Sequence, residues 1–475
     1  MEKIKRLFAT AASKNGSYSV GLTAMAVAAV LLFNLAAGQL PQQAKQIDIS
    51  DNRLYEISEV SRDLLEGLED PVEIRVLQKK ESYDDRLVRF LESYAALSPN
   101  LSLEWVDPVL HPSVLTEYET QQNNVVVSCE ATGKEKVIDY YDMIVPDYSS
   151  YYTTGSASEG QFDAEGQITG AVNTVTAGET HRIYYTSGHG ESALSSQVND
   201  LIEKISGETQ ELNLLMSTAV PEDCELLLIS GPTADLAAEE TALLRDYMNR
   251  GGKVMILLGM SKEEQPNLEG FLAEYGMTVE QGYAADMERN LQGNYYWIFP
   301  EVTAGSPITD KMETEMLLMT NAKGITQTDP ARDTISLNPV LQTSQEGYVV
   351  TEEGETRGQY LLGAVASETI AGSEEETEGE EEETKESRLT VLSSDTLIDG
   401  NLTAMYGSLE NLTLFMNLVT ENLSDVTNIS IEPKNLAVTY NTMQHVGTIS
   451  FAAVIGIPAL FLLGGFLQWR RRRKA

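Results

Sequence analysis

The sequence is poor in cysteine, which excludes several classes of covalently stapled domain. Only two of its 475 residues are cysteines, Cys129 and Cys224. They lie far apart, so they make neither a disulfide framework, nor a zinc ribbon, nor a CxxC redox site. The fold must therefore rest on hydrophobic cores, and 42% of the residues are hydrophobic. The length predicts two or three domains.

Basic residues are also scarce. Lys and Arg number 33 against 72 Asp and Glu, which gives a formal net charge of −39. Nucleic-acid binding needs clustered Lys and Arg to neutralise phosphates, so we expect no nucleic-acid partner. A Walker A pattern is missing, because Arg250-Gly251-Gly252-Lys253 lacks the leading glycine and a following Ser or Thr. The chain is not expected to hydrolyse nucleotide, and we predict no cofactor.

Charge is missing altogether from two stretches near the ends of the chain. Residues 15–44 and 435–469 contain no Asp, Glu, Lys or Arg, and their apolar centres are 20–40 and 446–467. Each centre has about 20 residues, which is the length that a helix needs to cross a bilayer. We therefore predict one transmembrane helix at each end, in contact with the lipid bilayer.

The charges beside these two stretches predict the topology. Basic residues precede the first stretch and follow the second: Lys3, Lys5, Arg6, Lys14, Arg470, Arg471, Arg472, Arg473 and Lys474. Because positive charge stays on the cytoplasmic side, residues 1–19 and 468–475 are expected to be cytoplasmic. The protein would then be a two-pass plasma-membrane protein with a large extracytoplasmic part. The alternative is a signal peptide cleaved near Ala36-Ala37-Gly38.

The extracytoplasmic part divides into three predicted blocks, of which the first is 47–146. A strand at 71–77, a helix at 84–97 and a strand at 101–106 follow one another. This order predicts a βαβ unit with parallel strands. The block resembles a thioredoxin-like layer without the redox cysteines.

The second block, 161–287, alternates buried strands with helices after an initial helix at 164–176. The predicted strands are 181–186, 224–230 and 253–258, and the predicted helices are 193–205, 237–249 and 265–275. This alternation predicts a doubly wound α/β sheet.

The third block, 288–435, is less regular and is predicted as a mixed α/β extension. Strand-like residues 359–366 and 389–393 flank an acidic run, 371–387, which has nine Glu and one Lys. Self-repulsion and the lack of apolar residues predict a disordered, solvated loop between neighbouring strands. Residues 411–423 are predicted to be helical.

One short motif stands out as a candidate ligand or partner site: Ser187, Gly188, His189, Gly190 and Glu191. It follows strand 181–186, and ligands of open α/β sheets bind beyond the carboxyl ends of strands. The two glycines allow a sharp turn, and His189 can titrate near neutrality. The alternative is a structural turn in which His189 and Glu191 cap and bridge. One His and one Glu are too few ligands for a metal site.

Two stretches of the second block carry a family resemblance. Phe162-x-Ala164-Glu165-x-x-Ile168-Thr169 and Ile183-Tyr184-Tyr185-Thr186-Ser187-Gly188-His189-Gly190-Glu191 resemble the gliding-motility-type (Gldg family) auxiliary components of ABC transport systems. Leu226–Pro232 and Tyr247–Val254 are similar to the section that follows. The resemblance implies an extracytoplasmic subunit that works with a separate ATPase and permease, and an amidotransferase-like fold for the second block.

These observations lead to one main functional prediction and two alternatives. We predict a non-enzymatic auxiliary, substrate-engaging subunit of an ABC transport system. No cysteine follows a strand in the turn that amidotransferase chemistry requires, and Cys224 begins an apolar strand, which is typical of a core residue. The alternatives are a membrane-anchored hydrolase that uses His189 and Glu191, and an envelope-polymer-binding ectodomain that uses the tyrosine-rich loop around Tyr151 and Tyr152.

Overall fold

The computed structural model describes most of the chain between Leu54 and Leu436. The described residues are 54–147, 158–177, 180–261, 263–303, 308–309, 312, 314, 316–351, 354–370, 385–406, 408–423, 426, 428–429 and 431–436. The predicted transmembrane segments, 20–40 and 446–467, and acidic residues 371–384 lie outside them. In the part that is described, no helix is long and apolar enough to cross a membrane. Every element below belongs to the compact unit Met1–Asn435.

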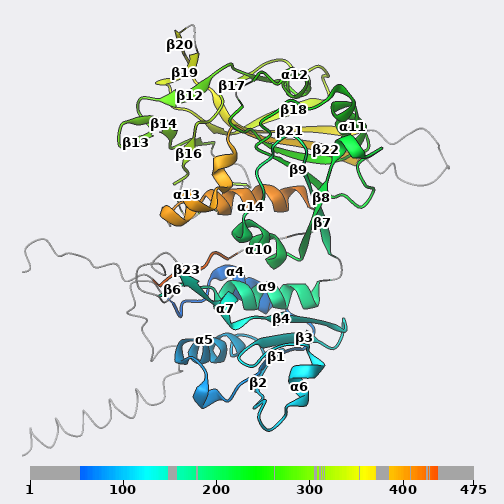
Figure 1. Cartoon of the computed structure of the whole chain (residues 1–475), viewed down its shortest axis with the longest axis vertical. Helices are drawn as coiled ribbons and strands as arrows, with labels where there is room; N and C mark the ends of the chain where they lie inside the picture. Colours follow the sequence, from blue (N-terminus) through cyan, green and yellow to red (C-terminus); the bar gives the residue numbers. More distant parts are fainter. Residues whose placement is uncertain are drawn as a thin grey trace, which may run out of the picture. The chain divides into compact units, whose positions relative to one another are not determined.

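The predicted βαβ unit is present near the amino end. Strands β1 (Val72–Val76) and β2 (Leu101–Trp105) are parallel and are joined through helix α5 (Asp85–Ala95). Strand β3 (Val125–Cys129) pairs antiparallel with β1, and β4 (Lys134–Ile138) pairs with β3. The sheet order is β2-β1-β3-β4 (Figure 1). The fold here is mixed α/β, as expected.

Helix α9 (Ala164–Thr176) has the predicted bounds but packs against the sheet of the first block. It contacts β3 and β4 and buries Ile168, Val172 and Val175. Helix α4 (Glu59–Glu66), capped by the Ser58 hydroxyl, also contacts α9. We call residues 54–147, 158–177 and 431–435 the N-terminal body. It also contains η1 (Lys80–Ser82), α6 (Ser113–Glu117), α7 (Tyr140–Met143), and a small sheet of β5 (Ile144–Asp147), β6 (Ser158–Phe162) and β23 (Lys434–Asn435).

A ten-stranded sheet forms the centre of residues 180–429, which we call the C-terminal body. Five strands are parallel, in the order β8 (Gly207–Leu212), β7 (His181–Thr186), β9 (Leu226–Ser230), β10 (Lys253–Leu257) and β22 (Lys385–Leu392). Leu226 and Leu228 face one core, whereas Leu227 and Ile229 face another. Side chains of β9 therefore alternate between two buried faces, which explains its continuous apolar sequence.

Helices cover both faces of the parallel strands, so this part is doubly wound as predicted. Helices α10 (Ser196–Lys204) and α14 (Asn411–Asn422) contribute to one core. Helices α11 (Ala238–Asn249) and α12 (Pro266–Glu274) contribute to the other (Figure 1).

The third predicted block completes this sheet. Strand β22 pairs parallel with β10 and antiparallel with β21 (Leu361–Ile370). Strands β11 (Met277–Val279), β17 (Ile325–Gln327), β18 (Ile335–Gln342) and β15 (Glu301–Val302) extend it by antiparallel pairing. Residues on both sides of the predicted boundary at 287–288 thus share one sheet.

The predicted acidic loop, 371–387, is three residues too long at its carboxyl end. Lys385, Glu386 and Ser387 belong to β22 and pair with Ile370, Thr369 and Glu368. Strand β21 is ten residues long, and its backbone groups provide partners for these three residues despite their polarity.

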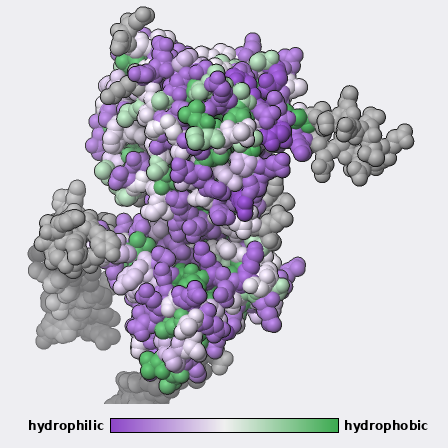
Figure 2. Space-filling model, turned by 45° about the vertical axis from the view of Figure 1, so that its right-hand side comes forward, coloured by the Kyte–Doolittle hydropathy of each residue, from purple (hydrophilic) through white to green (hydrophobic). Residues whose placement is uncertain are grey.

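Small antiparallel sheets and short helices complete the C-terminal body. These are β12 (Tyr283–Asp286) with β19 (Gly347–Thr351) and β20 (Gly354–Arg357), β13 (Asn290–Leu291) with β14 (Asn294–Ile298) and β16 (Met319–Thr320), and η2 (Leu214–Met216), η3 (Asp395–Ile398) and α13 (Gly400–Met405). The surface drawn in Figure 2 is mostly hydrophilic, with small, separate apolar patches. Among the most exposed apolar side chains are Met216 (85%) and Val109 (79%).

Candidate functional site

The predicted site loop lies at the carboxyl edge of the parallel sheet. It follows β7, which has β8 on one side and β9 on the other. The chain passes from β7 through α10 to β8 and then returns to β9, so the strand order reverses at β7. In open α/β sheets, this reversal creates the crevice in which ligands bind.

His189 is a buried brace between the site loop and α11. Its side chain is 9% exposed, and its Nε2 lies 2.9 Å from Glu240 Oε2 in the first turn of α11. The same Glu240 oxygen accepts the Ala237 amide at 2.8 Å. His189 Nδ1 lies 3.7 Å from Glu191 Oε1, and the His189 amide donates to Glu191 Oε2 at 2.6 Å. Both ring nitrogens therefore face carboxylates of the protein.

The two glycines of the loop have positive φ angles, as their predicted role in a turn requires. Gly188 has φ +125° and Gly190 has φ +75°. A Cβ at Gly190 would lie 2.2 Å from Thr233 Oγ1 in the loop after β9. The amides of Thr233 and Ala234 both donate to the His189 carbonyl, at 2.9 and 3.0 Å. The loops after β7 and β9 are thus packed backbone to backbone.

The turn after β9 lacks the cysteine that amidotransferase chemistry requires. Its first residue is Gly231, with φ +64°, and a Cβ there would lie 2.4 Å from Asp395 Oδ2. Asp395 also accepts the Ser192 hydroxyl at 2.8 Å. A glycine followed by Pro232 occupies the strand-to-helix turn, so acyl-transfer chemistry has no attacking group at this position.

Cys224 is a core residue, as predicted. It is 8% exposed, and its Sγ lies 3.4 Å from the Tyr247 hydroxyl. Burial raises the pKa of the Cys224 thiol to about 11, which disfavours the reactive thiolate. Tyr151 and Tyr152 of the predicted tyrosine-rich loop lie outside the described residues, as does Tyr148 before them, whereas Tyr140 stacks edge-on with Tyr83 and Tyr141.

A second polar cluster, which no motif in the sequence indicated, surrounds the amino end of α9. Asp163 Oδ2 lies 2.8 Å from Lys204 Nζ, and both side chains are at most 3% exposed. Glu165 Oε2 lies 3.1 Å from Lys434 Nζ. The sequence does show two acidic residues, Asp163 and Glu165, in the stretch after Phe162 that carries the family resemblance. Nothing in the sequence, however, identifies Lys204 and Lys434 as their partners.

Burial dominates the electrostatics of this cluster. It raises the pKa of Asp163 to about 7, although Lys204 favours the ionised form. Burial alone would lower the pKa of Lys204, but Asp163 and Asp200 outweigh it and the pKa is raised. Across the described ranges, no group of three or more His, Cys, Asp or Glu residues could hold a metal ion.

Two comparisons with protein families give matches. Residues 180–419 match a family described as "ABC-type uncharacterized transport system". Residues 51–145 match a family described as a domain of unknown function. No curated protein matches the chain.

Solved structures give matches of low identity. The mmIFT52 N-terminal domain is 15% identical, with a TM-score of 0.36, and the match covers 52% of this chain and 99% of that one. PurLQS from Thermotoga maritima is 11% identical, with a TM-score of 0.26 and coverage of 51% and 99%. A GMP synthase component from Thermoplasma acidophilum is 9% identical, with a TM-score of 0.27 and coverage of 51% and 94%.

Proposed function

The chain belongs to the family described as an ABC-type uncharacterized transport system, and from this premise we propose that it is the extracytoplasmic auxiliary subunit of such a system. In this proposal, helices at 20–40 and 446–467 anchor it in the plasma membrane. A separate permease provides the path and a separate ATPase provides the energy, since the chain lacks a Walker A pattern.

The family match over residues 180–419 carries the proposal. It spans almost the whole C-terminal body, including the site loop and most of α14. The finer assignments are part of the same proposal: a gliding-motility-type (Gldg family) member, with a thioredoxin-like N-terminal body and an amidotransferase-like C-terminal body.

We propose that the surface of the site loop engages the substrate or a neighbouring protein of the transport system. Gly188 and Gly190 are exposed, whereas the His189 side chain beneath them is buried. Asn213 lies against Gly188, and Met216, 85% exposed, follows three residues later at the same edge of the sheet. An exposed apolar side chain beside exposed backbone suits a protein contact better than a reaction centre.

The hydrolase alternative has weaker support. A general base needs a ring nitrogen that can reach a substrate proton. His189 Nε2 is occupied by Glu240 at 2.9 Å, and Nδ1 faces Glu191. These contacts favour the alternative interpretation of the motif as a structural turn that caps and bridges, beneath a contact surface.

Gentle purification of the full chain from membranes tests the proposal. We expect an ATPase and a permease to accompany it and to be encoded beside it. A useful comparison is Met216→Asp, which places charge on the proposed contact edge and should release these partners without unfolding the exposed site. If neither protein accompanies the native chain or is encoded nearby, the proposed function is wrong.

A further inference from the structure

Two acidic residues at the amino end of α9 bind three distant parts of the chain. Asp163 and Glu165 are two residues apart, and both are buried, at 2% and 3% exposed. Asp163 holds Lys204, the last residue of α10. Glu165 holds residues next to both ends of the described chain. A buried carboxyl that loses its hydrogen-bonded partner raises the free energy of the folded chain, so the fold keeps these partners together.

Glu165 joins the beginning of the N-terminal body to its end. Its Oε1 accepts the Ser58 amide at 2.6 Å and the Ser61 hydroxyl at 2.8 Å, both at the start of α4. Its Oε2 lies 3.1 Å from Lys434 Nζ, whose ammonium also donates to the Glu56 carbonyl at 2.6 Å. The main chain of Lys434 pairs with Phe162 in β23 and β6. The segments that lead to the two apolar stretches therefore meet at one carboxylate.

Lys204 fits against α9 at two glycines. A Cβ at Gly170 would lie 2.8 Å from Lys204 Cγ, and one at Gly166 would lie 2.7 Å from Lys204 Nζ. The ammonium also lies 2.9 Å from Asp200 and donates to the Ile431 carbonyl at 3.1 Å. The glycines at i and i+4 thus form a shallow groove for the lysine side chain, and α10 cannot shift along α9 without disturbing the buried ion pair.

Helix α10 connects this contact to the site loop and the parallel sheet. Its first turn is capped by the Ser195 hydroxyl, four residues after Glu191. Val198, Leu201 and Ile202 lie in the same core as Leu226 and Leu228 of β9. A displacement of α10 would therefore reach both the loop and the sheet.

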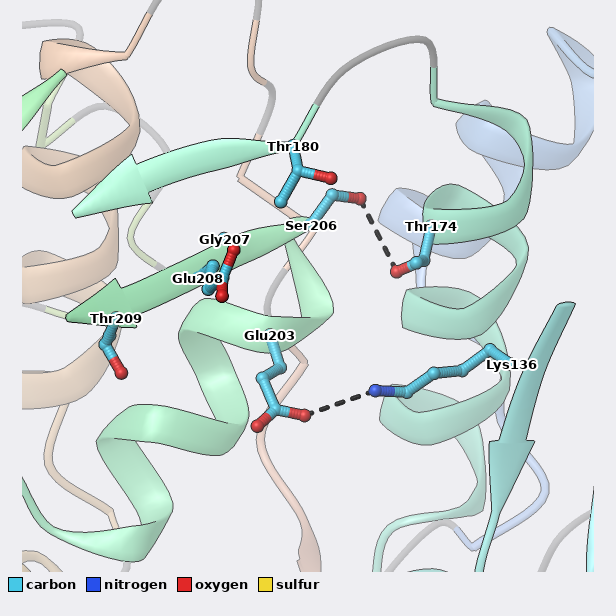
Figure 3. A pocket seen from close by; sticks show the side chains of 8 residues that line it. All are labelled: Lys136, Thr174, Thr180, Glu203, Ser206, Gly207, Glu208 and Thr209. Atoms are coloured by element: carbon cyan, nitrogen blue, oxygen red, sulfur yellow. Dashed lines mark hydrogen bonds and ion pairs between the residues drawn. The ribbon is translucent and has the colours of Figure 1, made fainter. Parts of the chain in front are cut away.

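A cavity lined mainly by polar residues lies beside the contact between α9 and α10 and leaves room for such a displacement (Figure 3). Its volume is about 340 Å³, and its walls come from β4 and α9 on one side and from α10 and β8 on the other. Two contacts cross it: Lys136 Nζ to Glu203 Oε2 at 3.2 Å, and Ser206 Oγ to Thr174 Oγ1 at 3.5 Å. The Lys136–Glu203 pair is exposed to solvent, so it restrains movement less than the buried Asp163–Lys204 pair.

We propose that α9 is a mechanical joint, in which Glu165 receives movement from the two chain ends and the Asp163–Lys204 pair passes it to α10, and so to the site loop. The inference rests on the proposed function for its biological meaning, since the chain ends would lead into the membrane helices. It assigns Asp163, Glu165, Lys204 and Lys434 to coupling rather than to ligand binding.

Amide hydrogen exchange on the full chain in detergent tests the joint without any partner protein. The first variant is Lys434→Met, which removes a partner of Glu165 and touches nothing in α10. We expect the amide exchange rates in α4 and α10 to rise at least tenfold over those of the native chain. The relative increase in β9 and β10 should be at least tenfold smaller than the increase in α10. Coupling is reciprocal, so Lys204→Met should raise exchange in α4.

The matched control is Lys80→Met, which breaks an exposed ion pair with Glu92 in the same body. Exchange in α10 should stay within twofold of the native value there. The joint is wrong if Lys434→Met affects only α4 and residues 431–435, or if all elements including β9 and β10 accelerate equally. Should Lys434→Met fail to fold, Glu165→Gln, which retains hydrogen-bonding capacity, is judged by the same comparison of α10 with β9.

The exchange result and the purification result are separate. Accelerated exchange in α10 in a chain that brings no ATPase or permease would retain the joint and remove the transport role. If both proteins co-purify but accelerated exchange is confined to α4, the transport role is retained and the joint is wrong.

Discussion

Gly190 is the residue of the site loop whose identity the fold constrains most. Its φ of +75° is rarely adopted by other residues, and its α-carbon faces Thr233 so closely that a Cβ would lie 2.2 Å from Oγ1. Both the conformation and the space therefore exclude a side chain. Since the Thr233 and Ala234 amides hold the His189 carbonyl, any shift here also disturbs the contact between the two loops.

We predict that Gly190→Ala lowers the free energy of unfolding by about 2–4 kcal/mol, because strain in the left-handed region adds to a steric clash. Gly293→Ala is the matched control: Gly293 has φ +85° with nothing within 4 Å of the added Cβ, so only the conformational term of about 1 kcal/mol remains. Chemical denaturation of both variants measures the difference. Equal losses would show that Thr233 moves aside freely.

At the scale of elements, the pairing register of the β21–β22 hairpin does not depend on the acidic segment that connects the two strands. Eight consecutive residue pairs, from Gly363–Leu392 to Ile370–Lys385, define it. Leu389 and Val391 are buried, so a slip by one residue would turn apolar side chains out of the core. The register is thus set by the core and by the neighbouring strand β10.

We therefore predict that residues 371–384 can be replaced by Asn-Gly with little effect on stability. Ile370 and Lys385 are directly paired, which is the spacing that a two-residue turn closes. The eight Glu of this segment are lost, so the formal net charge changes from −39 to −39 + 8 = −31. The free energy of unfolding, measured by thermal unfolding, should change by less than about 0.5 kcal/mol. A loss of several kcal/mol would assign a structural role to the acidic segment.

The elements themselves were largely predictable, but their pairing was not. The apolar face of α9 and the unbroken apolar run of β9 gave the correct type and nearly correct bounds, because local periodicity reflects burial. That α9 packs on β3 and β4, and that β22 lies beside β10, depends on contacts between residues far apart in sequence. Periodicity carries no information about such partners.

The same distinction applies to the candidate site. The turn at Gly188 and Gly190 followed from glycines placed directly after a strand. The partner of His189 did not, since Glu240 is 51 positions away, on α11. Lys204 looked like an ordinary charged helix end and proved to be 3% exposed. Buried polar partners are chosen by tertiary packing, so the sequence indicated the loop but not what it is braced against.

At the scale of the whole molecule, buried carboxyls should make stability fall as the pH rises through the neutral range. Burial raises the pKa of Asp163, beside Lys204 and Asp200, to about 7. Burial and the nearby Glu410 raise the pKa of Glu432 to about 7. Between about pH 4 and 7, the folded chain then binds more protons than the unfolded chain, so stability decreases with pH. Arg332 lowers the pKa of Glu368, so this residue changes the stability only at more acidic pH.

We predict that the free energy of unfolding is on the order of 1–3 kcal/mol lower at pH 8 than at pH 5. Asp163→Asn removes one of the two carboxyls and should reduce this difference. Thermal or denaturant unfolding of both chains at the two pH values measures it. A native chain that gains stability over this range would mean that Asp163 and Glu432 are ionised in the folded state with normal affinity for protons.

The buried cysteines allow the predicted topology to be tested on an almost native chain. Cys129 is 1% exposed and Cys224 8%, so neither should react quickly with a maleimide. Glu117 and Glu239 are exposed, one in each body, whereas Lys474 belongs to the basic tail. A cysteine introduced at any of these positions therefore reports which side of the membrane it occupies.

We predict that Glu117→Cys and Glu239→Cys react with a membrane-impermeant maleimide in intact cells stripped of any outer barrier, at least tenfold faster than Lys474→Cys. After permeabilisation, all three should react, while the unmodified chain stays unlabelled and serves as the control. The physical reason is the basic residues beside both apolar stretches, which favour the cytoplasmic side. Fast labelling of Lys474→Cys with protection of Glu117→Cys and Glu239→Cys would place the two bodies inside the cell, where they could not engage an extracytoplasmic substrate.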